Sequence, residues 1–358
     1  MTDRELYAVV MAGGSGTRFW PASRRARPKQ FLPVWGGRPM IAETCARLAG
    51  LVPWERILIV TAESQVALVH EALPELPREN VLAEPVARNT APAVAFAAEE
   101  VAKRSPRGIQ VVLPSDHVIR PTEAFQRTLL AAREEARASD ALVIFGVRPD
   151  HPATGYGYIE AGPTLATRDS IPVYAVASFV EKPARPRAEA FLAGGRHLWN
   201  SGMFVWSSTA ILGALQRHAP DISRGFARVR AGERLEQVYP TLPSVAIDVA
   251  VLEKDPHVRM LPIDYAWSDV GSWAARPELH ARDAEGNWAV LGAGARLVAE
   301  ESSGCLAYAE SDEVIALVGV RDLVVVRAGN ATLVCPRERA QDVKRIVERL
   351  AREDGRFL

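Results

Sequence analysis

The sequence predicts an α/β protein with a Rossmann-like, mostly parallel sheet flanked by helices, followed by a C-terminal β segment and a terminal helix. Short strands that are apolar throughout alternate with helical segments over most of the chain, as expected for strands covered on both faces. From about Gly286 the residue pattern changes to short runs of β-branched residues, separated by Gly, Asn and Asp residues typical of turns. Residues 1–280 are therefore expected to form an α/β domain, and residues 286–358 a second segment of β-strands and a terminal helix.

The individual elements follow from local periodicity. Continuous apolar runs predict strands at residues 7–11, 57–61, 110–113 and 141–146. Helical spacing predicts helices at 40–48, 65–71, 91–104 and 124–138, the third capped by Thr90. Less regular patterns indicate strands from 155, at 174–180 and at 202–206, and helices at 209–218 and 244–253.

The last 70 or so residues divide into β runs and one helix. Apolar runs at 314–320, 323–326 and 332–335 predict strands. The final segment, 337–352, is amphipathic, with an apolar face formed by Ala340, Val343, Ile346, Val347 and Leu350.

The charge balance, the apolar runs and the cysteine spacing limit which partners and cellular compartments are expected. The chain has 358 residues, 43 basic and 43 acidic, with pI near 7.1. This balance argues against nucleic acid as a partner. No apolar run approaches the roughly 20 residues that span a bilayer, and the start lacks a secretory pattern. Cys45, Cys305 and Cys335 lack metal-ligand spacing and indicate reduced thiols, so a cytoplasmic protein without a membrane partner is expected.

The most informative stretch is 9–32, in which a predicted strand runs into a glycine-rich bend. Gly13, Gly14 and Gly16 allow backbone N–H groups to approach an anion closely. From Leu6 to Ala42 there is no acidic residue, whereas six cations occur there: Arg18, Arg24, Arg25, Arg27, Lys29 and Arg38. A compact polyphosphate fits this imbalance; the alternative is a solvated basic loop. The chain lacks the P-loop pattern and the third glycine of the dinucleotide fingerprint.

These motifs resemble a known family. The segments GGSGTR (13–18), Pro21, Ser23 and PKQFL (28–32) are similar to the signature of sugar-nucleotide pyrophosphorylases, and WPxSR with PKQFL to the mannose-1-phosphate guanylyltransferase branch. The resemblance implies a left-handed β-helix for the C-terminal β segment. It also implies that Arg18 and Lys29 grip a triphosphate as catalytic residues. The implied nucleotide-binding set is Ala12, Gly13, Gly14, Ser15, Gly16, Thr17, Arg88, Asn89, Thr90 and Ser115.

Two aspartates are candidates for metal binding. Asp116 directly follows a buried parallel strand and therefore lies at the carboxyl edge of the sheet, where ligands bind in open α/β folds. A turn or cap aspartate is the alternative. Asp269 stands between Trp267 and Gly271, and the resemblance pairs it with Asp116 as a ligand of Mg²⁺. Magnesium prefers one or two carboxylates together with phosphate oxygens.

The sugar phosphate is expected at a third group of motifs. Glycines at 155 and 157 let a hydroxylated ring approach the backbone, and FVEKP (179–183) and WNSGMF (199–204) match family motifs. An exposed ion pair is the alternative for the Glu-Lys dipeptide. The implied sugar-phosphate residues are Gly155, Glu181, Lys182, Asn200 and Gly202.

Together these features predict transfer of GMP from GTP to α-D-mannose 1-phosphate by direct, Mg²⁺-assisted displacement. One alternative is a pyrophosphorylase for another sugar phosphate or nucleotide. A non-catalytic nucleotide-sugar sensor is a second. The terminal β segment and helix suggest a homodimer surface.

Overall fold

A computed structural model describes residues 5–14, 16–34, 37–275 and 281–358. The chain divides into two compact units. Unit 1 comprises the chain up to Gly13, Thr44–Pro114 and Ile119–Trp267; unit 2 comprises Gly14–Glu43, Ser115–Val118 and Ser268–Leu358. The glycine-rich loop therefore crosses from one unit to the other after Gly13. The predicted domain division at residues 280 and 286 stays a prediction.

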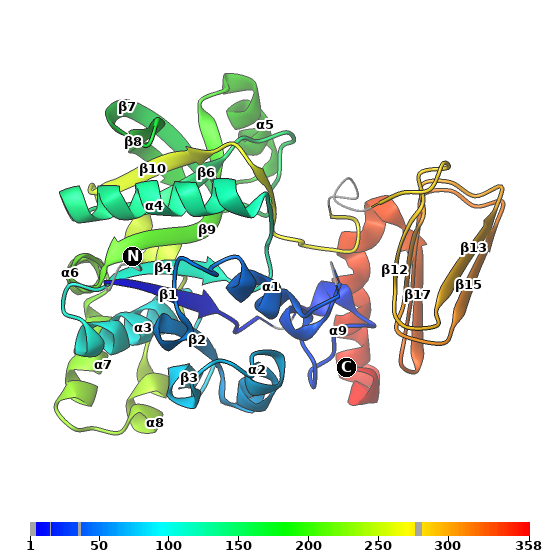
Figure 1. Cartoon of the computed structure of the whole chain (residues 1–358), viewed down its shortest axis with the longest axis horizontal. Coiled ribbons are helices and arrows are strands. Elements are labelled where there is room, and N and C mark those ends of the chain that lie inside the picture. Colours follow the sequence, from blue (N-terminus) through cyan, green and yellow to red (C-terminus); the bar gives the residue numbers. More distant parts are fainter. Residues whose placement is uncertain (1–4, 15, 35–36, 276–280) are drawn as a thin grey trace. The chain divides into compact units, whose positions relative to one another are not determined.

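Unit 1 is built on a nine-stranded sheet of order β3-β2-β1-β4-β9-β6-β10-β8-β7 (Figure 1). Adjacent strands in the series β3-β2-β1-β4 pair in parallel, and so do β6 and β10. The other strands, β9, β8 and β7, run antiparallel to their neighbours in the sheet. The strands are β1 (Leu6–Met11), β2 (Ile57–Ala62), β3 (Val81–Glu84), β4 (Ile109–Pro114), β6 (Leu142–Val147), β7 (Tyr158–Arg168), β8 (Ile171–Val180), β9 (His197–Ser207) and β10 (Val258–Ile263). Strands β5 (Val118–Arg120) and β11 (Ala266–Ser268) pair separately.

Helices cover both faces of this sheet. In unit 1, α3, α6 and α7 pack against one another on one side, and α4 lies across the other (Figure 1). The α-helices among the described residues are α1 (Met40–Ala46), α2 (Val66–Ala72), α3 (Thr90–Arg104), α4 (Thr122–Ser139), α5 (Arg185–Gly194), α6 (Ser208–His218), α7 (Pro220–Arg230), α8 (Leu235–Val238) and α9 (Val343–Glu353). No helix among the described residues has both the length and the apolar content to cross a membrane.

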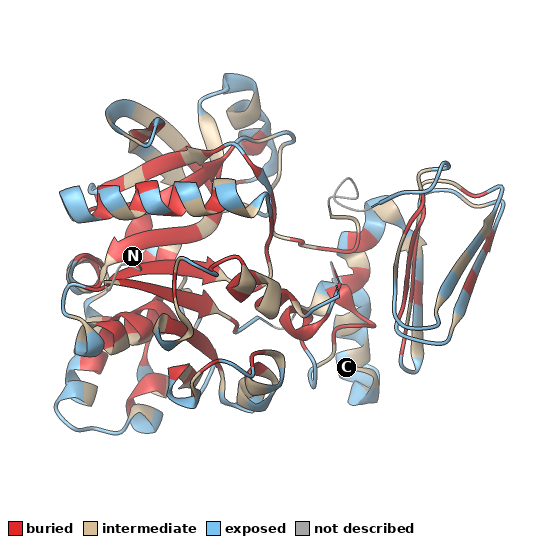
Figure 2. Cartoon of the chain, in the orientation of Figure 1, coloured by how far each residue is buried: buried red, intermediate tan, exposed pale blue. Residues whose placement is uncertain are grey.

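The core of unit 1 follows from the apolar runs. Strands β1, β2 and β6 are buried along nearly their whole length, and the alanine-rich face of α3 packs on β1 and β2 (Figure 2). Small alanine side chains let α3 approach the sheet closely, and larger residues from α6 and α7 complete the cluster. This rigid layer holds the ends of β1 and β4, from which predicted site residues extend.

Unit 2 contains a β-helix with a regular repeat. Its parallel strands are β12 (Trp288–Leu291), β13 (Arg296–Glu300), β14 (Leu306–Ala309), β15 (Val314–Val318) and β16 (Leu323–Ala328), closed by antiparallel β17 (Ala331–Pro336). Contacts between successive coils join residues 18 apart, as from Cys305 N–H to the Asn287 side chain. Gly286, Gly304 and Asp322, at the same spacing, all have positive φ, because each coil turns sharply there. The coil explains the Gly, Asn and Asp turns in the sequence; its left-handedness stays a prediction.

The segment 16–32, which carries most of the clustered cations and is called the basic loop below, is anchored in the core of unit 2. Phe19 lies against Trp273, with ring centroids 4.9 Å apart, and Trp273 lies against Tyr308 at 5.0 Å. The same cluster includes apolar residues of β12, β14 and β16 and of α9. The loop therefore has a fixed hydrophobic base although it carries many cations.

Most predicted elements are confirmed, but three details differ. The helix predicted at 244–253 is instead a π-helix, η7 (Asp248–Leu252), preceded by irregular chain. The cap of α3 is Asn89, not Thr90, because the Asn89 side chain accepts the Thr90 N–H. The terminal helix α9 begins at Val343 after a 3-10 segment, η9 (Arg337–Asp342).

Candidate active site

The glycine loop begins where β1 ends. A Cβ at Gly13 would lie 3.4 Å from the Glu84 carboxylate. Gly16 has φ +59°, and a Cβ there would lie 2.3 Å from Cβ of Lys29. Only glycine allows this close approach, so Gly16 fixes the path of the loop beside Lys29. Ser15 lies outside the described residues.

Lys29 is the centre of the predicted cluster in unit 2. Its side chain is only 4% exposed. The Nζ atom donates to the Asp116 carboxylate at 2.8 Å and to the Asp269 carbonyl oxygen at 3.0 Å. It also lies 5.0 Å from the centre of the Phe19 ring. The fold thus brings two predicted residues that are distant in sequence, Asp116 and Asp269, to the ammonium group of a third, Lys29.

The two aspartates differ in how they meet Lys29. Burial opposes ionisation of Asp116, but the Lys29 ammonium, His117 and the hydrogen bonds to the carboxylate together outweigh it, and the pKa of Asp116 falls below its ordinary value. Asp116 is therefore an anion at neutral pH. The Asp269 carboxylate accepts the N–H of Gly271 at 3.1 Å. Between them, Val270 has φ +48°, a conformation that β-branched residues rarely adopt. Such strain is typical of functional segments.

Arg18 approaches the same aspartate segment. A Cβ at Gly271 would lie 3.5 Å from Nη1 of Arg18, and this atom donates to the Gln341 side chain of η9 at 2.9 Å. Arg24 has a structural role, because it donates to the carbonyl oxygens of Pro21 and Phe357. Lys29 therefore contacts both Asp116 and Asp269, and Arg18 lies beside Gly271 in the segment that carries Asp269.

The predicted nucleotide-binding residues Arg88, Asn89 and Thr90 lie in unit 1, after β3. Asn89 caps α3 with φ +66° and ψ −171°, a region that residues other than glycine rarely occupy. Arg88 donates to the Pro240 carbonyl oxygen. Thr90 Oγ1 accepts the N–H of Ile247 at 2.8 Å. The neighbouring Ala12 N–H donates to the carbonyl oxygen of Val60 at 2.7 Å, which extends β1 toward the loop.

The predicted sugar-phosphate residues form a second cluster in unit 1. The Asn200 N–H donates to the Gly157 carbonyl oxygen at 2.8 Å, and a Cβ at Gly157 would lie 2.6 Å from the Glu181 carboxylate. Glu181 also pairs with Lys182 at 3.0 Å. Gly202, at φ +70°, donates its N–H to the Asn200 side chain at 3.1 Å. Glu181, Lys182, Asn200 and Gly202 thus gather at one place, whereas no contact of Gly155 with this cluster is among those described.

Sequence reasoning missed two acids of this cluster. Asp248 accepts from the Asn200 Nδ2 at 2.7 Å, and Glu253 accepts the Glu181 N–H at 3.0 Å. Asp248 is the first residue of η7 and Glu253 is its C-cap, positions at which they look like ordinary helix-terminal acids. No sequence signal distinguished them, because an apolar pattern does not reveal a π-helix.

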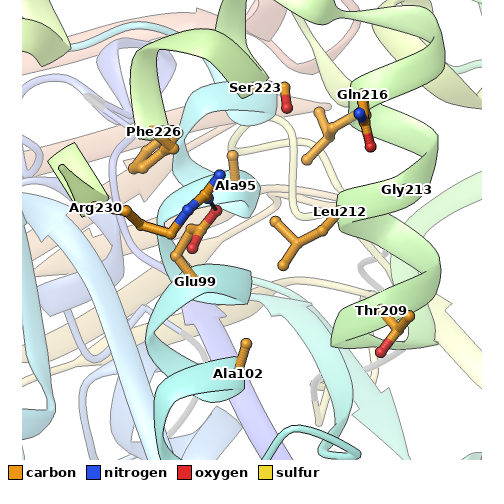
Figure 3. A pocket seen from close by; sticks show the side chains of 11 residues that line it. Ala95, Glu99, Ala102, Thr209, Leu212, Gly213, Gln216, Ser223, Phe226 and Arg230 are labelled. Carbon is orange, nitrogen blue, oxygen red and sulfur yellow. Dashed lines mark hydrogen bonds and ion pairs between the residues drawn. The ribbon is translucent and has the colours of Figure 1, made fainter. Parts of the chain in front are cut away.

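Unit 1 also has a cavity of about 450 Å³ between α3, α6 and α7 (Figure 3). Glu99 and Arg230 point toward one another in it and form an ion pair. Burial raises the pKa of Glu99 despite that pair. None of the predicted site residues lines this cavity.

The chemistry of the unit 2 cluster fits a hard divalent cation. Asp116 is ionised, and its carboxylate and that of Asp269 offer oxygen ligands of the kind that Mg²⁺ prefers. Within the described part of the chain, no group of three or more His, Cys, Asp and Glu side chains forms a metal site. A cation here would therefore need oxygens from a bound phosphate, as is usual for Mg²⁺.

Comparison with known proteins agrees with the Rossmann-like sheet of unit 1 and with the β-helix of unit 2. The sequence matches the nucleotidyl transferase family over residues 7–286 and a mannoseP isomerase/GMP-like β-helix domain over residues 295–350. The fold and these matches define a nucleotidyltransferase enzyme. More narrowly, the chain belongs to the family of mannose-1-phosphate guanylyltransferases, on the following similarities.

Two curated relatives carry that name. The one from Escherichia coli strain K12 is 39% identical, over 99% of this chain and 75% of its own length. The one from Klebsiella pneumoniae is 41% identical, over 96% and 73%. A crystal structure from Thermus thermophilus, described as a mannose-1-phosphate geranyltransferase, is 36% identical with a TM-score of 0.89 and covers 97% of this chain and 99% of that one.

Proposed function

We propose that the protein transfers GMP from GTP to α-D-mannose 1-phosphate and releases pyrophosphate. A phosphate oxygen of the sugar phosphate bonds to the α-phosphorus of GTP, and the bond from that phosphorus to the bridging oxygen breaks. Pyrophosphate leaves with the electron pair. The convergence of Lys29, Asp116 and Asp269 is the observation that carries the proposal, because two anions react and a fixed cation must offset their charge.

Lys29 and Arg18 have the central roles in this mechanism. The ammonium of Lys29 is held by two contacts before substrate arrives, so it needs little reorganisation to stabilise charge on the α-phosphate. Arg18 would bind the leaving phosphates in a bidentate manner. Backbone N–H groups of the loop at Gly13, Gly14, Gly16 and Thr17, with Ser115, would complete the triphosphate site.

Asp116 and Asp269 would hold Mg²⁺. Bound there, the cation would offset charge on the phosphates and help to align them. Loss of activity in EDTA, restored by Mg²⁺, tests this role. Activity that survives EDTA at full rate would contradict it.

The residues of unit 1 would select the substrates. Asn89 carries both a donor and an acceptor suited to a guanine edge, with Arg88 and Thr90 beside it. Gly155, Glu181, Lys182, Asn200 and Gly202 would bind the sugar phosphate. The Glu181 carboxylate and the Asn200 carboxamide oxygen would accept hydrogen bonds from sugar hydroxyls, and the Lys182 ammonium would donate to the phosphate. Another sugar phosphate or nucleotide is the alternative.

A panel of substrates decides between GTP with mannose 1-phosphate and another pair of nucleotide and sugar phosphate. Pyrophosphate release is measured for GTP, UTP, dTTP and ATP, each with mannose 1-phosphate and glucose 1-phosphate. We expect the highest kcat/KM for GTP with mannose 1-phosphate. A preference for another pair would favour the alternative, and no turnover with any pair would favour a nucleotide-sugar sensor.

We also propose a cytoplasmic homodimer that uses the β-helix. Val314 and Val318 of β15 are 63% and 73% exposed, and Val298 of β13 is 44% exposed. These side chains share the outward face of the two-stranded β13–β15 sheet. Exposed apolar patches of this kind commonly mark interfaces. A Val314→Lys, Val318→Lys variant is expected to sediment as a monomer; an unchanged sedimentation coefficient would contradict this surface.

A further inference from the structure

The side chain of Asp248 fixes the orientation of Asn200. Its Oδ1 accepts from the Asn200 Nδ2 at 2.7 Å, and the Asn200 Oδ1 accepts the N–H of Gly202 at 3.1 Å. Because an ionised carboxylate only accepts, the nitrogen of the carboxamide must face Asp248. One N–H and one lone pair of the carboxamide then remain for a ligand.

The π-helix that carries Asp248 is tied to other predicted binding residues. Just before it, the Ile247 N–H donates to Thr90 at 2.8 Å. Just after it, Glu253 accepts the N–H of Glu181 at 3.0 Å. A π-helix is uncommon and often marks a functional site. This one segment therefore contacts residues from three predicted motifs.

The charged groups around Asp248 come from one loop. Burial, and then the Glu181 carboxylate, raise the pKa of Asp248 to about 6, whereas Lys182 favours its ionised form. Helix α6 packs against the π-helix and carries Arg217 and His218, but these pair with Asp255 at 2.8 and 3.1 Å.

We propose that Asp248 is a positioning residue of the sugar-phosphate site, which holds the Asn200 carboxamide in the orientation that binds vicinal sugar hydroxyls. The inference rests on the proposed function, because it needs a sugar phosphate at Asn200. It assigns a role to an acid that no family motif in the sequence singled out.

Two substitutions at Asp248 separate its charge from its shape. Asp248→Asn keeps an acceptor of the same size, and Asp248→Ala removes it. We expect KM for mannose 1-phosphate to rise roughly 10- to 100-fold in Asp248→Ala, as for a lost hydrogen bond to a charged group, and less in Asp248→Asn. KM for GTP should stay close to the wild-type value in both.

The pH dependence of KM for mannose 1-phosphate distinguishes a positioning role of Asp248 from a purely structural one, because a structural role would not make the effect of Asp248→Asn change with pH. Above pH 6 the wild-type Asp248 is ionised and binds the Asn200 amide most strongly. Below pH 6 it becomes neutral, as Asn is at every pH. The ratio of KM for mannose 1-phosphate between Asp248→Asn and wild type should therefore approach 1 as pH falls through 6. Titration of the substrate phosphate affects both proteins equally.

Stability provides the control. Because the fold disfavours the charged form of Asp248, Asp248→Asn should melt no lower than wild type above pH 6. Val249→Ala changes an exposed residue of the same π-helix and should leave both KM values unchanged.

Equal KM values for mannose 1-phosphate in wild type and Asp248→Ala would overturn the inference. So would a parallel rise in both KM values with a lowered melting temperature in Asp248→Asn. If the wild type prefers another sugar phosphate, the same comparison is made with that substrate, so that a wrong substrate and a wrong role for Asp248 are told apart.

Discussion

The buried ammonium of Lys29 and the half-buried carboxylate of Asp116 form an ion pair, with Nζ and Oδ2 2.8 Å apart. Removal of Lys29 should lower kcat about 10²- to 10³-fold, comparable to the loss of one preorganised transition-state donor. Lys29→Met keeps the length of the side chain but removes its charge. Steady-state kinetics at saturating GTP measure the loss. Near wild-type kcat would show that Lys29 does not act at the α-phosphate.

The same pair predicts a change in pH dependence. Lys29 lowers the pKa of Asp116, so the pair stabilises the fold above the ordinary Asp pKa of about 3.9 and this contribution is lost as pH falls through the lowered pKa. Without Lys29, burial raises that pKa. The stability difference between wild type and Lys29→Met, measured by urea denaturation, should therefore be largest near neutral pH and narrow in acid. A difference independent of pH would contradict this coupling.

Gly16 should tolerate no side chain. An added Cβ would meet Cβ of Lys29 at 2.3 Å, and φ is +59°. Gly16→Ala is therefore expected to displace Lys29 and to reduce kcat toward the value of Lys29→Met, with a loss of stability of about 1–3 kcal/mol from backbone strain. Gly194→Ala, where nothing lies within 4 Å and φ is not positive, is the matched control. Wild-type kinetics in Gly16→Ala would contradict the steric argument.

The backbone of Asn89 predicts an order among its variants. Asn89→Ala loses the capping hydrogen bond of α3, which should lower the free energy of unfolding by about 1 kcal/mol. Alanine also keeps a Cβ in a backbone conformation that glycine prefers, so the strain at this position remains. Asn89→Gly relieves that strain and should be clearly more stable than Asn89→Ala in urea denaturation, although both should discriminate GTP from ATP less well.

Ser207 provides the comparison, because it caps α6 at an ordinary φ of −75°. The difference in stability between the Gly and Ala variants should be smaller at Ser207 than at Asn89. An equal difference at the two caps would mean that the positive φ of Asn89 stores no strain.

The sequence predicted the sheet and its helices because buried parallel strands and amphipathic helices leave strong periodic patterns. The resemblance also grouped Lys29, Asp116 and Asp269, and in the structure Lys29 contacts the carboxylate of Asp116 and the backbone carbonyl oxygen of Asp269. The sequence did not predict the role of Asp248, because an acid in a π-helix resembles one in any helix end. Nor did it predict that Asn89 rather than Thr90 caps α3, since both residue types cap helices and only the positive φ distinguishes them.

Gln341 links the β-helix unit to its own basic loop, because its Oε1 accepts from Nη1 of Arg18 at 2.9 Å. This contact is exposed, so Gln341→Ala should raise KM for GTP only about 2- to 10-fold and leave the melting temperature unchanged. Gln341→Glu should raise it more, because a carboxylate competes with the triphosphate for the guanidinium. Added salt should reduce that effect by screening the new pair. Glu338→Gln in the same 3-10 segment serves as the control. If Gln341→Glu binds GTP as tightly as wild type at low salt, Arg18 does not contact the triphosphate, and its proposed role would have to pass to another cation of the loop.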